Sequence, residues 1–147
     1  MLYGLARPTA DVDFVQVAPK GASASLLQLA GKGAELHRRH GLYLDLVTIV
    51  TLPEDYNQRL TEMFPGAFKH IRLFALDPYD LALAKLERNI QRDRDDVKHL
   101  ARTIPFDLDV LTARYEKELR PYLANPTRED LTLRLWIEAI QEERGKP

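Results

Sequence analysis

Polar and apolar residues alternate near the start of the chain, from Asp11 to Val17. Successive side chains of a strand point to opposite faces of its sheet. Asp11 and Asp13 would therefore share one face, and Val12 and Phe14 the other. The pattern predicts a strand that carries two acidic residues on one side.

Two further apolar runs are typical of strands. In the run over residues 42–50, Tyr43 and Asp45 fall on one face and Leu44 and Leu46 on the other. The run over residues 70–76, "HIRLFAL", is the third. The three runs together predict a small three-stranded sheet.

Apolar positions at helical spacing predict helices between and after these strands, over residues 23–40, 53–63, 77–102, 105–121 and 128–143. Asp77 is a good N-cap with Pro78 at the first helical position, and a break is expected near Asn89. The fold class is therefore α/β (α+β), a three-stranded sheet with flanking helices and a C-terminal helical extension. We expect a core over 1–103 and an extension over 104–147, packed as one compact unit.

Composition narrows the class of protein. The formal net charge is −1, which excludes a bulk basic field for binding nucleic acid and leaves only a local basic patch for such a role. The absence of cysteine excludes disulfides and Cys-zinc sites and suits a reducing compartment. No apolar run approaches the roughly 20 residues that span a bilayer. We expect a cytoplasmic protein with no membrane segment.

The acidic residues of the first two strands are the main candidate for chemistry. Asp11 and Asp13 emerge on one face, roughly 6 to 7 Å apart along the strand. If the second strand is the neighbour of the first, Asp45 projects from the same face. Clustered carboxylates repel one another, and a hard divalent cation, Mg²⁺ or Mn²⁺, relieves that repulsion. The alternative is that these residues are exposed acids of a strand, although Asp is disfavoured there.

Two stretches carry a resemblance to a known family. "RPTADVDFV" followed by "LYLDLV" resembles the nucleotidyltransferase-like superfamily of the DNA polymerase β type. The nearest form is a bacterial group related to abortive-infection (AbiEii-like) toxins, which carries R-x-T-x-D-[VI]-D. The later stretch "LDPYDLALAKLERNIQRDRDDVKHLA" is similar to the downstream segment of the same group. Together these stretches span most of residues 4–101.

The resemblance assigns roles to individual residues. It implies that Asp11 and Asp13 are the metal-binding pair, and that Asp45 is the third carboxylate, which accepts the proton of the incoming hydroxyl or aligns it. Arg7 and Thr9 match the positions just before the metal-binding strand. Lys85 matches a lysine that approaches the nucleotide phosphates in relatives.

A charged stripe follows the third strand. Lys85, Arg88, Arg92 and Asp96 recur at helical spacing. One interpretation directs Lys85 and Arg92 toward the acidic residues and the nucleotide, with Asp93 and Asp96 orienting them. The other is a solvated face with ion pairs between successive turns, each worth a few tenths of a kcal/mol.

Full relatives carry a strand ending in Gly-Gly or Gly-Ser, then a helix, before the metal-binding strand. Here only "MLYGLA" stands before Arg7, so we expect the phosphate-binding turn to be missing from this sequence and catalysis to be weak or absent. Loss of that segment is also expected to expose a strand edge and favour a homodimer.

Two functions remain open. The first is metal-dependent transfer of a nucleoside monophosphate from a nucleoside triphosphate to a hydroxyl of tRNA or of a protein. The second is a non-catalytic binding or regulatory module of a toxin–antitoxin pair, with a toxin or antitoxin as its partner.

Overall fold

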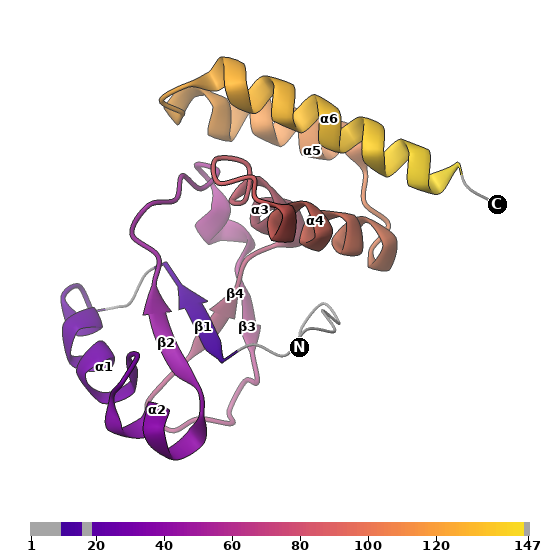
Figure 1. Ribbon diagram of the computed structural model, residues 1–147. Helices are drawn as coiled ribbons and strands as arrows, with labels where there is room; N and C mark the ends of the chain where they lie inside the picture. The colour runs from indigo at the N-terminus through magenta and orange to yellow at the C-terminus, as the bar shows by residue number, and fades with distance from the viewer. Residues whose placement is uncertain (1–9, 16–18, 146–147) are drawn as a thin grey trace. The chain divides into compact units, whose positions relative to one another are not determined.

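The computed structural model describes residues 10–15 and 19–145. Its helices and short paired strands form a mixed α/β structure, which confirms the predicted fold class (Figure 1). Two compact units are present, one formed by the described residues up to Val50 and the other by those from Thr51 onward. Each unit is described by itself below.

The first unit is built on two parallel strands. β1 (Asp11–Phe14) pairs with β2 (Tyr43–Leu46) in the register Asp11↔Tyr43, Val12↔Leu44, Asp13↔Asp45 and Phe14↔Leu46. Parallel neighbours need a crossover connection. Two helices, α1 (Ala22–Ala30) and α2 (Glu35–His40), supply it.

The helix expected over residues 23–40 is divided into α1 and α2. Gly31 leaves the helix and forms an isolated parallel bridge with Leu44 of β2, and Gly33 adopts φ 81°. Left-handed backbone of this kind is cheap only for glycine, and a residue in it cannot continue a helix, so Gly33 keeps α1 and α2 apart. Gly41, at φ 70°, then ends α2 as the expected C-cap.

The second unit begins with an antiparallel strand pair, which corrects two predictions. Residues 53–63 were expected to be a helix, yet they form a 3₁₀ turn, η1 (Tyr56–Arg59), followed by β3 (Thr61–Met63). The predicted third strand is β4 (Leu73–Ala75), and it pairs with β3. Among the described residues the strands therefore form two separate two-stranded sheets instead of one three-stranded sheet. The ladder with β4 satisfies the backbone of β3, and it outweighs the helical pattern of the segment.

Helices make up the rest of this unit. Asp77 accepts a hydrogen bond from the Tyr79 N–H and caps α3 (Pro78–Leu83). The expected break occurs at Asn89, with φ 44°, before α4 (Gln91–Thr103). There follow α5 (Leu108–Arg114), a π-helical turn η2 (Tyr115–Leu119), a 3₁₀ turn η3 (Arg120–Tyr122) and α6 (Pro126–Arg144).

These helices share one hydrophobic core, in which α4 packs against α3 and α6 (Figure 1). Its fully buried members include Leu83, Leu100, Phe106 and Leu111, and Trp136 of α6 is 5% exposed. The boundary expected between residues 103 and 104 falls inside this core, because residues on both sides of it pack together.

Candidate functional site

The parallel register of β1 and β2 brings two candidate acids together. Asp13 and Asp45 are direct partners across the strand pair, and neighbouring strands lie about 4.8 Å apart. Partners in register point to the same face of the sheet, so Asp11, Asp13, Tyr43 and Asp45 share one face, with Asp11 one pleat repeat before Asp13. We call these four residues the acid face. Asp13 and Asp45 are exposed, and Asp11 is partly buried.

The donor chemistry of the acid face suits a hard divalent cation, since carboxylate oxygens are the ligands that Mg²⁺ and Mn²⁺ prefer. Within residues 10–15 and 19–145, however, no three His, Asp or Glu side chains lie close enough to hold a metal ion together. The acid face therefore fits a metal in donor type, with Asp13 and Asp45 as the adjacent pair, and it is not a preassembled three-ligand site. Arg7 and Thr9 lie outside the described residues.

Lys85 is enclosed by carboxylates of its own unit. Its ammonium lies 3.0 Å from Asp96 and 3.7 Å from Asp93, and its side chain is 18% exposed. Arg88 adds two hydrogen bonds to Asp93, at 2.9 and 2.5 Å. These pairs do not join successive turns of one solvated helix. Lys85 and Arg88 precede the break at Asn89, their partners on α4 are five to eleven residues away, and Asp93 is fully buried. A phosphate at Lys85 would have to share the ammonium with these two acids.

Asp93 stays ionised in this setting. Burial by itself raises its pKa, but hydrogen bonds from Arg88 and from the Ile90 N–H, together with the charges of Arg88 and Lys85, hold the pKa of the carboxyl below its usual range. The Ile90 contact also caps α4, since Asp93 reaches back to the residue before the first turn. Arg92 lies on the same helix and is exposed.

Comparison with known proteins assigns the chain to a family. Residues 1–144 match the family model described as "Nucleotidyltransferase of unknown function (DUF6036)". The chain belongs to this family. No curated protein and no solved structure matches it. The match supports the nucleotidyltransferase resemblance of the sequence. In addition, none of the described helices of this family member is long and apolar enough to cross a membrane.

The family member contains a buried ionic network that sequence reasoning missed. Asp80 is fully buried and accepts hydrogen bonds from Arg59, at 2.9 and 3.0 Å, and from Arg114, at 3.0 Å. Asp77 and Glu118 complete the network through Arg114 and Arg59. The hydrogen bond to Asp80 is the main reason that the pKa of Arg59 is raised. This network joins η1, α3, α5 and η2.

In the sequence, Asp80 stands in the first turn of the helix that Asp77 caps, where an acidic residue is favourable whatever else it contacts. The available signal was Asp77 and Asp80 on one helix, and Arg114 and Glu118 on another, at spacings of three and four residues. Nothing in those spacings pairs the two segments with each other or with Arg59.

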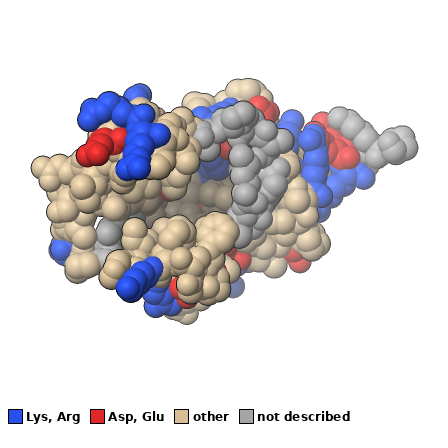
Figure 2. Space-filling model, turned by 90° about the horizontal axis from the view of Figure 1, so that it is seen from below, with Lys and Arg blue, Asp and Glu red and all other residues tan. Residues whose placement is uncertain are grey.

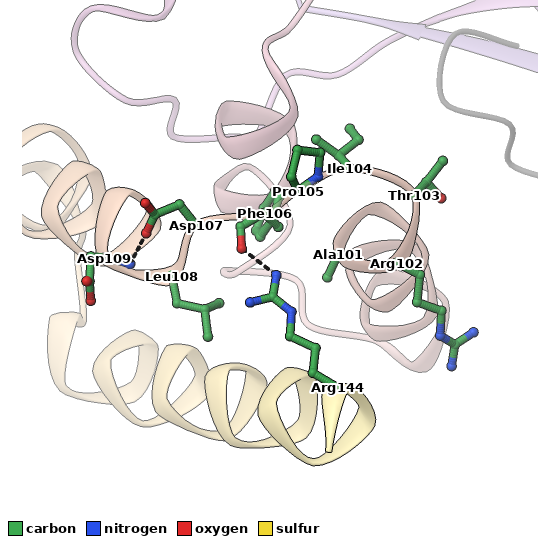
Figure 3. Close-up of a pocket in the computed structure, with 10 residues that line it drawn as sticks. All are labelled: Ala101, Arg102, Thr103, Ile104, Pro105, Phe106, Asp107, Leu108, Asp109 and Arg144. Atoms are coloured by element: carbon green, nitrogen blue, oxygen red, sulfur yellow. Dashed lines mark hydrogen bonds between the residues drawn. The ribbon is translucent and has the colours of Figure 1, made fainter. Parts of the chain in front are cut away.

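A pocket lies where the end of α4, the start of α5 and the end of α6 meet (Figure 3). Arg144 reaches across it and donates to the Phe106 carbonyl. Asp107 accepts from the backbone of Asp109 and Val110, and so caps α5. Arg102 is paired with Glu143. Arg144 and Asp107 thus hold the turn between α4 and α5, and the pair of Arg102 with Glu143 joins α4 to α6.

Proposed function

We propose that this nucleotidyltransferase family member transfers a nucleoside monophosphate from a nucleoside triphosphate to a hydroxyl, with Mg²⁺ or Mn²⁺ as cofactor. The observation that carries the proposal is the register of β1 and β2. It supports a site in which Asp13 and Asp45, direct partners on adjacent strands, act with Asp11 on the same face.

The roles of the three acids follow from their chemistry. Asp11 and Asp13 would hold the cation, and Asp45 would share it while accepting the proton of the acceptor hydroxyl. The acceptor oxygen then forms a bond to the α-phosphorus, the bond from that phosphorus to the bridging oxygen breaks, and pyrophosphate leaves. A bound divalent cation supplies charge neutralisation for the phosphate oxygens and orients the attacking hydroxyl.

In this proposal, basic residues bind the nucleotide phosphates. Lys85 is the main candidate, with Arg92 exposed on the same unit and Arg7 and Thr9 as the further residues implied by the resemblance. Because Asp93 and Asp96 already hold Lys85, the gain from a phosphate at its ammonium is reduced by the loss of those pairs. We therefore expect weak nucleotide binding. The acceptor class proposed is tRNA or a protein.

A second candidate is a non-catalytic module of an AbiEii-like toxin–antitoxin pair, acting through a partner toxin or antitoxin or as a homodimer. Two observations favour it. The described part of the chain holds no three-ligand metal group, and β1 has a strand partner on only one edge among the described residues. An open strand edge is a template for pairing with another chain.

Calorimetric titration with Mn²⁺ tests the proposal. We expect weak binding that Asp11→Ala combined with Asp13→Ala abolishes, because two of the three oxygen-donating side chains are then gone. The control variant, Asp95→Ala combined with Asp109→Ala, removes two exposed helical acids and is expected to bind as wild type does. Transfer of label from an α-labelled nucleoside triphosphate to tRNA or to the protein is then measured with the same variants.

Two results would decide against the enzyme. Equal heats of Mn²⁺ binding in wild type and the Asp11/Asp13 variant would show that these two acids do not bind the metal. Mn²⁺ binding without any label transfer would leave the non-catalytic module as the better account.

A further inference from the structure

A short basic surface surrounds the connection between α1, α2 and β2. Between residues 32 and 40 the only acidic residue is Glu35, and the other charged or titratable residues are Lys32, His37, Arg38, Arg39 and His40. All of these except His37 are exposed. On the face that Figure 2 shows, Lys and Arg side chains gather in separate groups with Asp and Glu among them. The basic surface is therefore local, in a chain whose formal net charge is −1.

The loop between α1 and α2 fixes the shape of this surface. Gly31 is bridged to Leu44 of β2, and the Gly33 N–H donates to Nδ1 of His37 at 2.9 Å. Arg38 donates to the Gly33 carbonyl at 2.7 Å. Accepting the bond from Gly33 orients the His37 ring and leaves its proton on Nε2, which is a donor. The loop and the helix thus hold each other in one arrangement.

Tyr43 joins the basic surface to the acid face. Its ring centroid lies 4.9 Å from that of His37, in an edge arrangement, and 5.6 Å from the Lys32 ammonium. Tyr43 is also the register partner of Asp11 and stands two residues before Asp45 on the same face. A ligand that contacts Lys32 and Tyr43 is therefore directed along β2 toward Asp45, which lies about 6 to 7 Å further on.

The helix dipole accounts for only part of this arrangement. Cations in the last turn of a helix are favourable whatever they bind, which accounts for Arg38 and Arg39 of α2. Lys32 precedes the helix and gains nothing from its C-terminus. Its position over Tyr43 places a cation and an aromatic ring together, the combination that binds single-stranded nucleic acid by phosphate pairing and base stacking.

We propose that Lys32, Arg39 and Tyr43 form the acceptor-binding surface, and that the acceptor is the end of a single-stranded RNA. Lys32 and Arg39 bind its phosphates, Tyr43 stacks on a base, and the terminal hydroxyl lies toward Asp45. The direction in which the RNA runs, with its terminal hydroxyl toward Asp45, depends on the proposed transferase function. The binding of RNA does not depend on that function, because it uses none of the three aspartates.

Fluorescence anisotropy with a labelled short single-stranded RNA tests the surface, in chelator and without nucleoside triphosphate. Each phosphate contact to a single strand contributes a slope of about 0.7 to the dependence of log K on log salt concentration. Lys32→Ala combined with Arg39→Ala is therefore expected to lower the slope by about 1.4 and to weaken binding about 25-fold at 0.1 M salt. The control, Lys117→Ala combined with Arg134→Ala, removes the same charge from exposed sites of the other unit and is expected to bind as wild type does.

Tyr43 is tested with a conservative pair of variants. Tyr43→Phe keeps the ring and is expected to bind as wild type does, whereas Tyr43→Leu is expected to lose at least about fivefold. Circular dichroism of each variant identifies any that fail to fold, and Lys32→Gln combined with Arg39→Gln replaces the alanine pair in that event.

Three results would overturn the inference. They are no RNA binding by wild type, equal losses in the test and control pairs, or displacement of the RNA by polyglutamate at equal charge, which would indicate a general polyanion surface. Because the assay contains no metal or triphosphate, its failure leaves the transferase proposal to its own test. Conversely, an intact RNA surface without label transfer would count against the enzyme alone.

Discussion

Replacing Asp80 with asparagine should unfold the helical unit well below the wild-type temperature. The side chain is fully buried and accepts three hydrogen bonds from two guanidinium groups. The side chains of Arg59 and Arg114 are themselves only 22% and 13% exposed. Asparagine keeps the shape of the side chain but removes its charge, and one of its two polar atoms becomes a donor that faces other donors.

The size of the destabilisation depends on the ion pairs that remain after the substitution. Arg59 keeps Glu118 at 2.6 Å and Arg114 keeps Asp77 at 2.5 Å, so two acids are left for two bases. Removing one partner of a buried ion pair typically costs about 3–5 kcal/mol. For a chain of this size each kcal/mol lowers the melting temperature by about 2–4 °C. We therefore expect Asp80→Asn to lower Tm by roughly 6–20 °C.

Trp136 makes the assay specific to this unit. It is the only tryptophan of the chain, it is 5% exposed, and it lies in the core shared by the helices. Its fluorescence during heating and in urea therefore follows the unfolding of the residues from Thr51 onward. The control is Asp95→Asn, the same substitution at an exposed site whose hydrogen bond is to Gln91. We expect it to change stability by less than about 0.5 kcal/mol.

A loss below about 1 kcal/mol for Asp80→Asn would refute this reasoning, since it would mean that Asp77 and Glu118 already neutralise both guanidinium groups. The double variant with Arg59→Met provides a second test. If the groups act as one network, it should lose less than the sum of the two single variants. Strictly additive losses would show that Asp80 and Arg59 contribute independently.

Three further predictions concern other parts of the chain. The folded-state pKa of Asp93 lies below its unfolded value, so its contribution is present above about pH 4 and is lost as pH falls through the folded value; urea unfolding of wild type should show this acid loss, and Arg88→Ala should reduce it. Asp13→Asn should raise Tm in chelator by about 2–4 °C, because repulsion between register partners near 5 Å is worth roughly 1 kcal/mol at the surface; a fall in Tm measured by circular dichroism would indicate a structural role for Asp13. Asn89→Ala should cost about 2 kcal/mol or more, since it loses a left-handed residue and the acceptor for Trp136 Nε1; in urea titrations Asn89→Gly should recover the backbone part only, and equal losses would assign the effect to the side chain.

Local chemistry explains what could be predicted from sequence. The alternation around Asp11 and Asp13 identified β1, and the Asp77–Pro78 pair identified the start of α3. The break near Asn89 and the cap at Gly41 follow from the preferences of single residues for left-handed backbone. Even the match between Asp13 and Asp45 was accessible, given only that the two strands are neighbours.

Features that depend on residues far apart in the sequence could not be predicted from it. The segment Thr61–Met63 has no strand pattern of its own. It becomes a strand because it pairs with Leu73–Ala75 through an antiparallel ladder of backbone hydrogen bonds. The network at Asp80 joins residues 21, 34 and 59 positions apart. Local periodicity carries no information about such pairings, so the stripe at Lys85 was recognised while the network at Asp80 was missed.

The uneven burial of the chain has a consequence for its fluctuations. Among residues 10–15 and 19–50, Gly31 is the only one that is buried, whereas the hydrophobic core is drawn from residues 82–140. Amide hydrogens are protected by the burial and cooperativity of the structure around them. The amides of β1 and β2 should therefore exchange with solvent deuterium much sooner than those of α4 and α6. The residues of the acid face contribute little to the free energy of folding. Substitutions at Asp11, Asp13 and Asp45 during evolution therefore have small effects on the stability of the helical core.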